Sequence, residues 1–199
     1  MISRVPGLGL ATRAEWKRVA GKTAPPAIPD YLFREKAAFG PGPHRIILCR
    51  EDVREGLLQA RRANEPMGEL LHRPANVPRA MLAAQLKRLL DAMRKCEDFE
   101  VALMPRSAFK KLELEMVCWP GSVAAGWLQD GSESMFAVDG ITVRTYAAAM
   151  EYTWDKMQKG WKRRRNVTAT LHKWLAGDGL DTPEQDSKIV ENWDLMPRE

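Results

Sequence analysis

The chain has 199 residues, of which 45% are hydrophobic and 29% are charged, and its net charge is +5 at pH 7. This composition is typical of a globular protein with a core. No run of 18 apolar residues and no signal peptide is evident, so we expect a cytoplasmic protein that does not span a membrane.

Residues 1–43 are interrupted by proline and glycine, most densely in the "GPGP" sequence that ends at Pro43. Only the segments 12–20 and 31–38 are regular enough to predict short helices. We therefore expect an extended, Pro/Gly-rich N-terminal arm over residues 1–43 that lies outside the folded domain.

The next segments alternate between apolar runs and helical patterns. "HRIILC" (44–49) predicts a buried strand, and the acids Glu51 and Asp52 favour the start of a helix that follows it. "MGELLHR" (67–73) predicts a second strand. The clearest helix is "RAMLAAQLKRLLDAMRKC" (79–96), because its leucines and Met93 recur every three or four residues.

Four further segments complete the predicted fold. "FEVALM" (99–104) predicts a strand. In residues 112–119 every second side chain is Leu, Met or Cys, and the side chains between them begin with two glutamates, which is typical of a strand with one face solvated at its start. Pro120-Gly121 and Asp130-Gly131 then join this strand to 122–129 and 134–138. The sequence therefore predicts a three-stranded antiparallel meander.

A helical stripe of large apolar side chains follows the turn at Asp139-Gly140. Its members are spaced by three and four residues: Val143, Tyr146, Met150, Trp154, Met157 and Trp161. Such a stripe buries a helix against a sheet or against a second subunit. Its inward packing is the favoured interpretation, and the candidate interface residues are Tyr146, Met150, Trp154 and Trp161.

The stripe runs into a basic segment. Seven Lys or Arg residues and no Asp or Glu lie between Lys156 and Lys173. The candidate nucleic-acid-binding residues are Lys159, Lys162, Arg163, Arg164, Arg165 and Lys173. These cations, interleaved with tryptophans, could contact phosphates and stack bases. The alternative is an ordinary solvated helix end, because cations are favoured near a helix C-terminus by the dipole alone.

An acidic segment comes directly after the basic one. Residues 178–199 hold seven acids and only two bases, Lys188 and Arg198. Such a tail can compete with an anionic partner or fold back onto the cations.

No motif for phosphate loops, dinucleotides, zincins or serine hydrolases is present, and we assign no catalytic residue. The three cysteines and three histidines lie far apart in the sequence, so we expect free thiols, no metal site and no cofactor. An enzyme would need His44, Cys49 and either Glu113 or Glu115 to converge, and nothing in the sequence indicates that they do.

The segment "GELLHRPANVPRAMLAAQLKRLLDAMRKCEDFEVALMP" (68–105) resembles the regulatory domain of bacterial helix-turn-helix transcription regulators. "VDGITVRTYAAAMEYTWDKM" (138–157) resembles the closing helix of the same domains, which are of antitoxin-like or catalytically inactive phospholipase-D-like type. The resemblance covers residues 45–159. It implies a sensing or partner-binding module that is often dimeric and performs no chemistry. The broken segment 1–43 is too short for the helix-turn-helix of those regulators.

These patterns together predict one α+β domain over residues 44–175, with an acidic tail over 176–199. We expect a mixed sheet that contains the meander and is packed by two long amphipathic helices. The expected function is that of a non-enzymatic regulatory protein that acts by dimerisation or by binding a protein partner or ligand. The alternative is a direct nucleic-acid-binding protein of a phage or mobile element that uses the basic helix 156–173.

Overall fold

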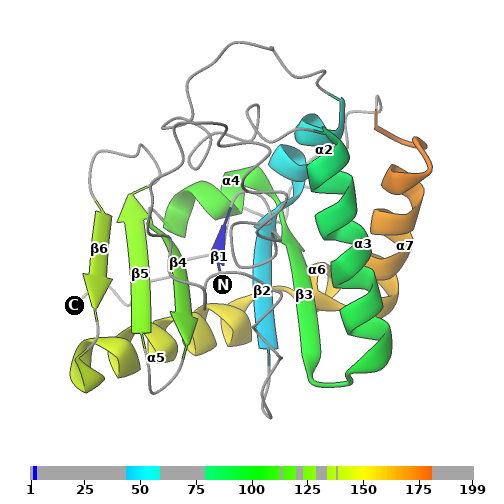
Figure 1. Cartoon of the computed structure of the whole chain (residues 1–199). Coiled ribbons are helices and arrows are strands. Elements are labelled where there is room, and N and C mark those ends of the chain that lie inside the picture. Colours follow the sequence, from blue (N-terminus) through cyan, green and yellow to red (C-terminus); the bar gives the residue numbers. More distant parts are fainter. Residues whose placement is uncertain are drawn as a thin grey trace.

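A computed structural model describes residues 2–3, 44–58, 79–112, 114–119, 123–128, 134–137 and 139–180. These residues form one mixed sheet with helices on both of its faces (Figure 1). The strand predicted at 67–73 and the short helices predicted at 12–20 and 31–38 lie outside the described residues.

The described elements follow one another in a fixed order along the chain. They are β1 (Ile2–Ser3), β2 (His44–Cys49), α2 (Arg50–Leu58), α3 (Arg79–Lys95), β3 (Phe99–Met104), α4 (Arg106–Phe109), η6 (Lys110–Leu112), β4 (Leu114–Trp119), β5 (Val123–Leu128), β6 (Ser134–Ala137), α5 (Gly140–Lys156), α6 (Lys159–Lys162) and α7 (Arg164–Leu175).

The six strands are arranged in the order β3-β2-β1-β4-β5-β6. β2 is parallel to both β1 and β3, and Ile47 stands opposite Ile2 on one side and Ala102 on the other. β4 is antiparallel to β1, and β5 is antiparallel to both β4 and β6. Because parallel strands need a long crossover, the connection from β2 to β3 runs through α2 and α3.

The α+β class stands, but the architecture that we expected from the sequence is wrong. Ile2 and Ser3 do not belong to an arm outside the domain, because they form β1 in the middle of the sheet, between β2 and β4. The side chain of Ile2 is only 1% exposed. Two residues are too few for any periodicity, so the sequence pattern could not reveal this strand.

The expected packing by two long helices is also wrong, because two separate layers of several helices cover the sheet. Ile46 and Leu48 of β2 face a cluster formed with α2, α3 and α7. Ile47 and Cys49 point to the opposite face and join a cluster formed with α4, α5 and α6. The unbroken apolar run of β2 is therefore that of a strand buried on both faces.

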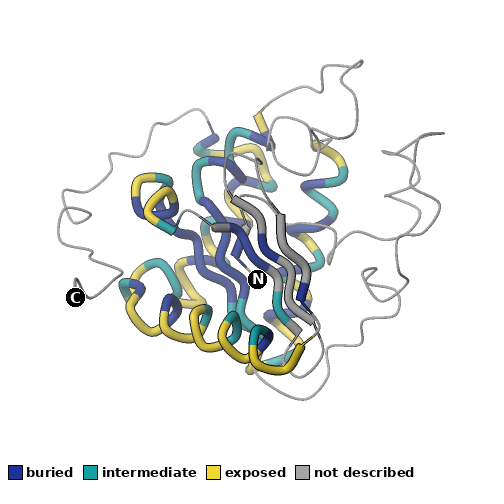
Figure 2. The backbone as a smooth tube through the Cα atoms, turned by 90° about the vertical axis from the view of Figure 1, so that its left-hand side faces the viewer, coloured by how far each residue is buried: buried dark blue, intermediate teal, exposed yellow. Residues whose placement is uncertain are grey.

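Helix α5 begins at a side-chain cap. The carboxylate of Asp139 accepts a hydrogen bond of 2.8 Å from the backbone N–H of Thr142, and this bond holds the pKa of Asp139 below its usual value. The cap fixes the direction in which α5 leaves β6. Figure 2 shows α5 running along the face of the sheet, with its inner side buried and its outer side exposed.

Gln85 of α3 is a polar side chain buried in the core. Its side chain is 0% exposed, and neither its amide nitrogen nor its amide oxygen has a hydrogen-bond partner among the residues that the structure describes. An unpaired buried amide costs free energy, whereas an apolar side chain of similar shape does not. We expect Gln85→Met to raise the free energy of unfolding by about 1–2 kcal/mol in urea denaturation.

The control for this prediction is Gln85→Asn, which keeps the amide but leaves a small void. We expect Gln85→Asn to lower the stability of the protein. A loss of stability in Gln85→Met as large as that in Gln85→Asn would mean that the amide of Gln85 is hydrogen-bonded in solution.

Candidate functional site

The basic segment is divided among three helices instead of forming the single helix 156–173. Helix α5 ends at Lys156, and the backbone of Met157 and Gln158 is extended. The short helix α6 follows, and a further extended residue, Arg163, separates it from α7. The break falls where Met157 turns its side chain into the core, three residues before Gly160.

The aromatic stripe of α5 covers the sheet within a single chain. Trp154 is only 3% exposed and belongs to the core cluster on this face. Tyr146, Met150 and Trp161 are partly buried and pack against the same cluster. The structure therefore brings all four predicted interface residues together on one face of the sheet.

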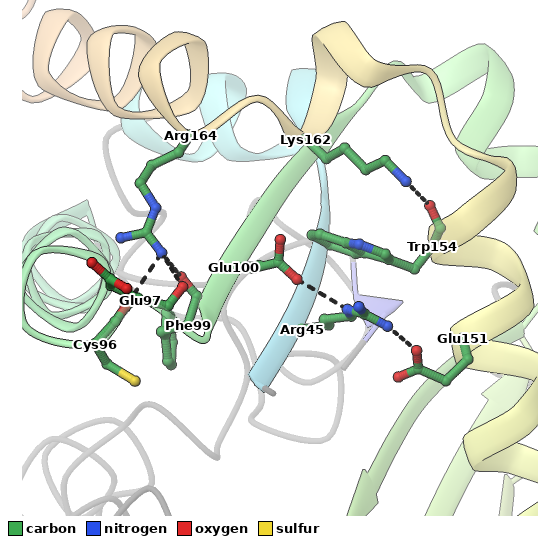
Figure 3. A network of polar contacts seen from close by, with 9 residues as sticks. All are labelled: Arg45, Cys96, Glu97, Phe99, Glu100, Glu151, Trp154, Lys162 and Arg164. Atoms are coloured by element: carbon green, nitrogen blue, oxygen red, sulfur yellow. Dashed lines mark hydrogen bonds and ion pairs between the residues drawn. The ribbon is translucent and has the colours of Figure 1, made fainter. Parts of the chain in front are cut away.

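Lys162 turns towards this stripe. Its ammonium donates a hydrogen bond to the backbone carbonyl of Trp154 and lies 5.5 Å from the centre of the indole ring. The guanidinium of Arg45 lies 5.3 Å from the same ring and forms ion pairs with Glu100 and Glu151 (Figure 3). This set of contacts ties α6 to α5 and to the strands β2 and β3.

Arg164 also turns inwards, towards the end of α3. Its guanidinium donates a hydrogen bond to the backbone carbonyl of Met93. It also donates to the carbonyls of Cys96, Glu97 and Phe99, the last at 3.0 Å (Figure 3). Carbonyl groups at a helix C-terminus have no partner within the helix, so a cation at this place satisfies them. Arg164 thus joins the start of α7 to the connection between α3 and β3.

The remaining predicted cations point outwards. Lys159, Arg163 and Arg165 are exposed, and none of them forms an ion pair with another described residue. Lys173 is exposed near the other end of α7, where its side chain lies against the backbone of Gly179. The structure therefore separates Lys159, Arg163 and Arg165 from Lys162 and Arg164, although the five residues lie within one short stretch.

The position of the cations on α7 differs from the one that the sequence suggested. Arg163 is the N-cap residue of α7, its side chain makes no capping hydrogen bond, and no acid stands in the first turn. The N-terminus of a helix carries partial positive charge, so cations there are disfavoured by about 0.3–1 kcal/mol each. Arg163 is also the C-cap residue of the four-residue helix α6, so a favourable interaction with a helix C-terminus is available to Arg163 but not to Arg165.

A groove lies between α3 and α7, the two helices that pack on the same face of the sheet. It has a volume of about 440 Å³ and is lined by Lys87, Leu90, Asp91, His172, Leu175 and Ala176. Asp91 forms an ion pair of 3.3 Å with Arg94, so its charge is balanced within α3. The sequence did not indicate this groove, because Lys87 and His172 become neighbours only when α3 packs against α7.

A third group of charges lies at the carboxyl ends of β2 and β3. Arg106 forms ion pairs with Asp52 and with Glu55, the latter at 2.6 Å, and its backbone N–H donates to Glu51. These contacts raise the pKa of Arg106 and join α2 to α4. Because each of the three carboxylates is paired, we interpret this cluster as a structural link.

His44 and Cys49, which the enzyme interpretation requires to converge, do not lie together. His44 and Cys49 occupy opposite ends of β2, which separates them by about 17 Å at 3.3 Å per residue. Burial raises the pKa of the Cys49 thiol, so this thiol stays protonated and unreactive at neutral pH. Glu115 is buried on β4, and Glu113 lies outside the described residues.

Comparison with known proteins gives no relative. No protein-family model, curated protein or solved structure matches this chain. In the part of the chain that the structure describes, no helix is long and apolar enough to cross a membrane. The same residues contain no group of three or more His, Cys, Asp or Glu side chains placed to hold a metal ion.

Proposed function

We propose that this chain is a non-enzymatic regulatory protein that binds the phosphate backbone of nucleic acid through the outward cations Lys159, Arg163 and Arg165. The observation that carries the proposal is the position of Arg163 and Arg165 at the N-terminal end of α7. Cations and the helix dipole are both attractive to an anion at this place. A phosphate group bound here would offset the unfavourable interaction between these cations and the helix.

The inward cations support the proposal because they fix the outward ones. Lys162 is held by Trp154, and Arg164 is held by four carbonyls at the end of α3. Arg163 therefore lies between two anchored residues, and Arg165 directly follows one of them. Less conformational entropy is lost when a phosphate binds cations on a fixed backbone than when it binds cations on a flexible one.

The mode of binding follows from the burial of the tryptophans. Trp154 and Trp174 are each 3% exposed, so neither can stack on a base. The proposal therefore does not include the stacking of bases on Trp154 or Trp174 that the sequence suggested. We expect binding to depend on charge and salt and to show little preference for base sequence.

A partner-binding role is the second candidate. On the outer face of α5, Ile141 is 73% exposed and Tyr152 is 42% exposed. Eleven residues correspond to three helical turns, so these two side chains share one face. This face would suit a protein partner of the kind that the resemblance to regulator domains implies. In either role we place the protein in the cytoplasm, in keeping with its three free cysteines.

The test of the proposal is the full-length double variant Arg163→Gln/Arg165→Gln. Each neutralised phosphate contributes about 0.9 to the slope of log affinity against log salt for duplex DNA. We therefore expect the slope to fall by about 2 and the affinity at low salt to fall about tenfold or more. Fluorescence anisotropy with labelled duplex and single-stranded DNA and RNA, over a salt series, measures both quantities.

Lys110→Gln is the matched control, because Lys110 is an exposed cation on η6, away from α6 and α7. We expect it to leave the salt slope nearly unchanged. We expect thermal unfolding of the double variant to occur at the wild-type temperature or slightly above it. Because the double variant removes two charges and the control removes one, a loss of log affinity in Lys110→Gln of half that in the double variant would show that net charge alone drives binding, and would refute the assignment of the site.

A further inference from the structure

Helix α5 carries a second stripe of side chains, on the face that points away from the sheet (Figure 2). Its members follow one another at steps of four, three and four residues: Ile141, Thr145, Ala148 and Tyr152. All four are exposed, and Ile141 and Tyr152 are two of the three exposed large apolar side chains in the part of the chain that the structure describes. This spacing is the one by which two helices pack along a coiled-coil seam. The stripe therefore has the pattern of a surface on which a second helix packs.

The polar groups of this stripe do not prevent its burial. The hydroxyl of Thr145 donates a hydrogen bond of 3.1 Å to the backbone carbonyl of Ile141, so it already has a partner within the helix. The ammonium of Lys156 lies 5.4 Å from the centre of the Tyr152 ring, and it can stay in water while its aliphatic stem follows the ring. Ala148, in the middle of the stripe, is small and lets a second backbone approach closely. Covering the stripe therefore costs little in unpaired polar groups.

The charges beside the stripe change sign along α5. Arg144 lies in the first half of the helix, and Glu151 and Asp155 lie seven and eleven residues later on the same flank. All three side chains are exposed. Glu151 forms an ion pair with Arg45, whereas Arg144 and Asp155 form none with a described residue. One flank of the stripe is therefore basic near its N-terminal end and acidic near its C-terminal end.

A flank of this kind is complementary to a second copy of itself that runs in the opposite direction. In a two-fold symmetric pair, residue i of one copy contacts residue j of the other, and j contacts i. An axis at Ala148 brings Arg144 level with Tyr152 of the second copy, since each lies four residues from Ala148. Arg144 then lies between Glu151 and Asp155 of that copy. Two parallel helices would instead place like charges beside each other, which is unfavourable, so the charges favour the antiparallel pair.

The apolar ends of the stripe meet in the same arrangement. Ile141 lies within one helical turn of Tyr152 of the second copy, and the two-fold axis repeats this contact at the other end. Both side chains are exposed in the single chain, so their contact removes apolar surface from water. Helix α5 has 17 residues and is about 25 Å long, and one pair of such helices buries less than about 1,200 Å² in total. An interface of this size is typical of weak, reversible association.

We infer that two copies of this chain associate through the outer faces of α5, antiparallel about an axis at Ala148. This face is opposite to the one that carries Tyr146, Met150 and Trp154, three of the interface residues that the sequence predicted. The inference deepens the partner-binding role given above as the second candidate, and it does not depend on nucleic-acid binding.

Sedimentation velocity of the full-length protein over a concentration series, without nucleic acid, tests the association. We expect a reversible monomer–dimer equilibrium with a dissociation constant on the order of 10 µM. Arg144→Glu puts an acid between the acids of the second copy, so we expect it to weaken association about tenfold or more. Lys87→Glu is the matched control, because it makes the same change of charge at an exposed position of α3, which packs on the opposite face of the sheet. We expect it to change the dissociation constant by less than about twofold.

Mixing two variants tests the antiparallel arrangement. Asp155→Lys places a cation beside Arg144 of the second copy, and we expect it to weaken association as Arg144→Glu does. An equimolar mixture of the two variants forms a pair with one native end and one end of reversed charges. We therefore expect its association to return to within about threefold of wild type. Both variants are expected to unfold at the wild-type temperature at low concentration, because neither side chain forms an ion pair with a described residue of its own chain.

Three results would overturn the inference. A wild-type protein that stays monomeric at every concentration would exclude the association and leave the salt-dependent test of nucleic-acid binding unaffected. Equal dissociation constants for Arg144→Glu and Lys87→Glu would place the dimer on another surface. Weaker association of both α5 variants without recovery on mixing would exclude the antiparallel arrangement.

Discussion

Arg164→Ala is expected to lower the free energy of unfolding by about 3 kcal/mol. The guanidinium of Arg164 donates to the carbonyls of Met93, Cys96, Glu97 and Phe99, which belong to the end of α3 and the start of β3. Hydrogen bonds that involve a charged group contribute about 1.5–3 kcal/mol each, and bonds that share one donor group do not add fully. Alanine leaves the carbonyls of this connection without the partner that α7 supplies.

Urea denaturation followed by far-UV circular dichroism measures this loss, and Arg164→Lys and Arg165→Ala are the matched variants. Lysine keeps the charge but cannot reach several carbonyls with one planar group, so we expect it to recover about half of the loss. Arg165→Ala removes an outward cation and is expected to change stability by less than about 0.5 kcal/mol. If Arg164→Ala and Arg165→Ala were equally stable, the hydrogen bonds between Arg164 and the end of α3 would not contribute to the free energy of unfolding.

The local pattern of the sequence was sufficient for the elements whose side chains repeat over many residues. Helix α3 was predicted at 79–96 and lies at Arg79–Lys95, and the runs "HRIILC" and "FEVALM" form β2 and β3. In each case a long stripe or an unbroken apolar run is buried by its neighbours, so local pattern and tertiary packing agree.

The predictions that were wrong concern features that only tertiary contacts create. β1 is two residues long and is defined by its partners β2 and β4, not by a pattern of its own. The helix expected to continue beyond Lys156 is interrupted at Met157, which packs against the core from the extended residues between α5 and α6, and Trp161 of α6 packs against the same core. Helical spacing alone gives the same stripe for one bent helix and for two helices in succession.

The candidate site could be predicted only in part for the same reason. The density of cations drew attention to the segment that begins at Lys159. The sequence could not show that Arg164 donates to carbonyls more than sixty residues away, whereas Arg163 and Arg165 make no ion pair with a described residue. Nor could it show that Arg165 stands in the first turn of a helix, which reverses the sign of its interaction with the dipole.

Trp154→Ala is expected to have the largest effect on stability, a loss of about 4 kcal/mol, because burial of an aromatic side chain in a core contributes about 3–5 kcal/mol. The indole of Trp154 is 3% exposed, and both Lys162 and Arg45 lie over its ring. Trp154→Phe keeps an aromatic face for the two cations and fills part of the space. We expect this variant to lose about half as much stability as Trp154→Ala.

Thermal unfolding of wild type and both variants at several protein concentrations also separates a core role from an interface role. A residue buried within one chain changes the unfolding temperature by the same amount at every concentration, whereas a residue at a subunit interface changes it in a concentration-dependent way. We expect the first behaviour, because Trp154 packs against β-strands of its own chain. A concentration dependence in the wild type that disappears in Trp154→Ala would instead place Trp154 between subunits, and α5 would then have to expose its aromatic stripe in the monomer.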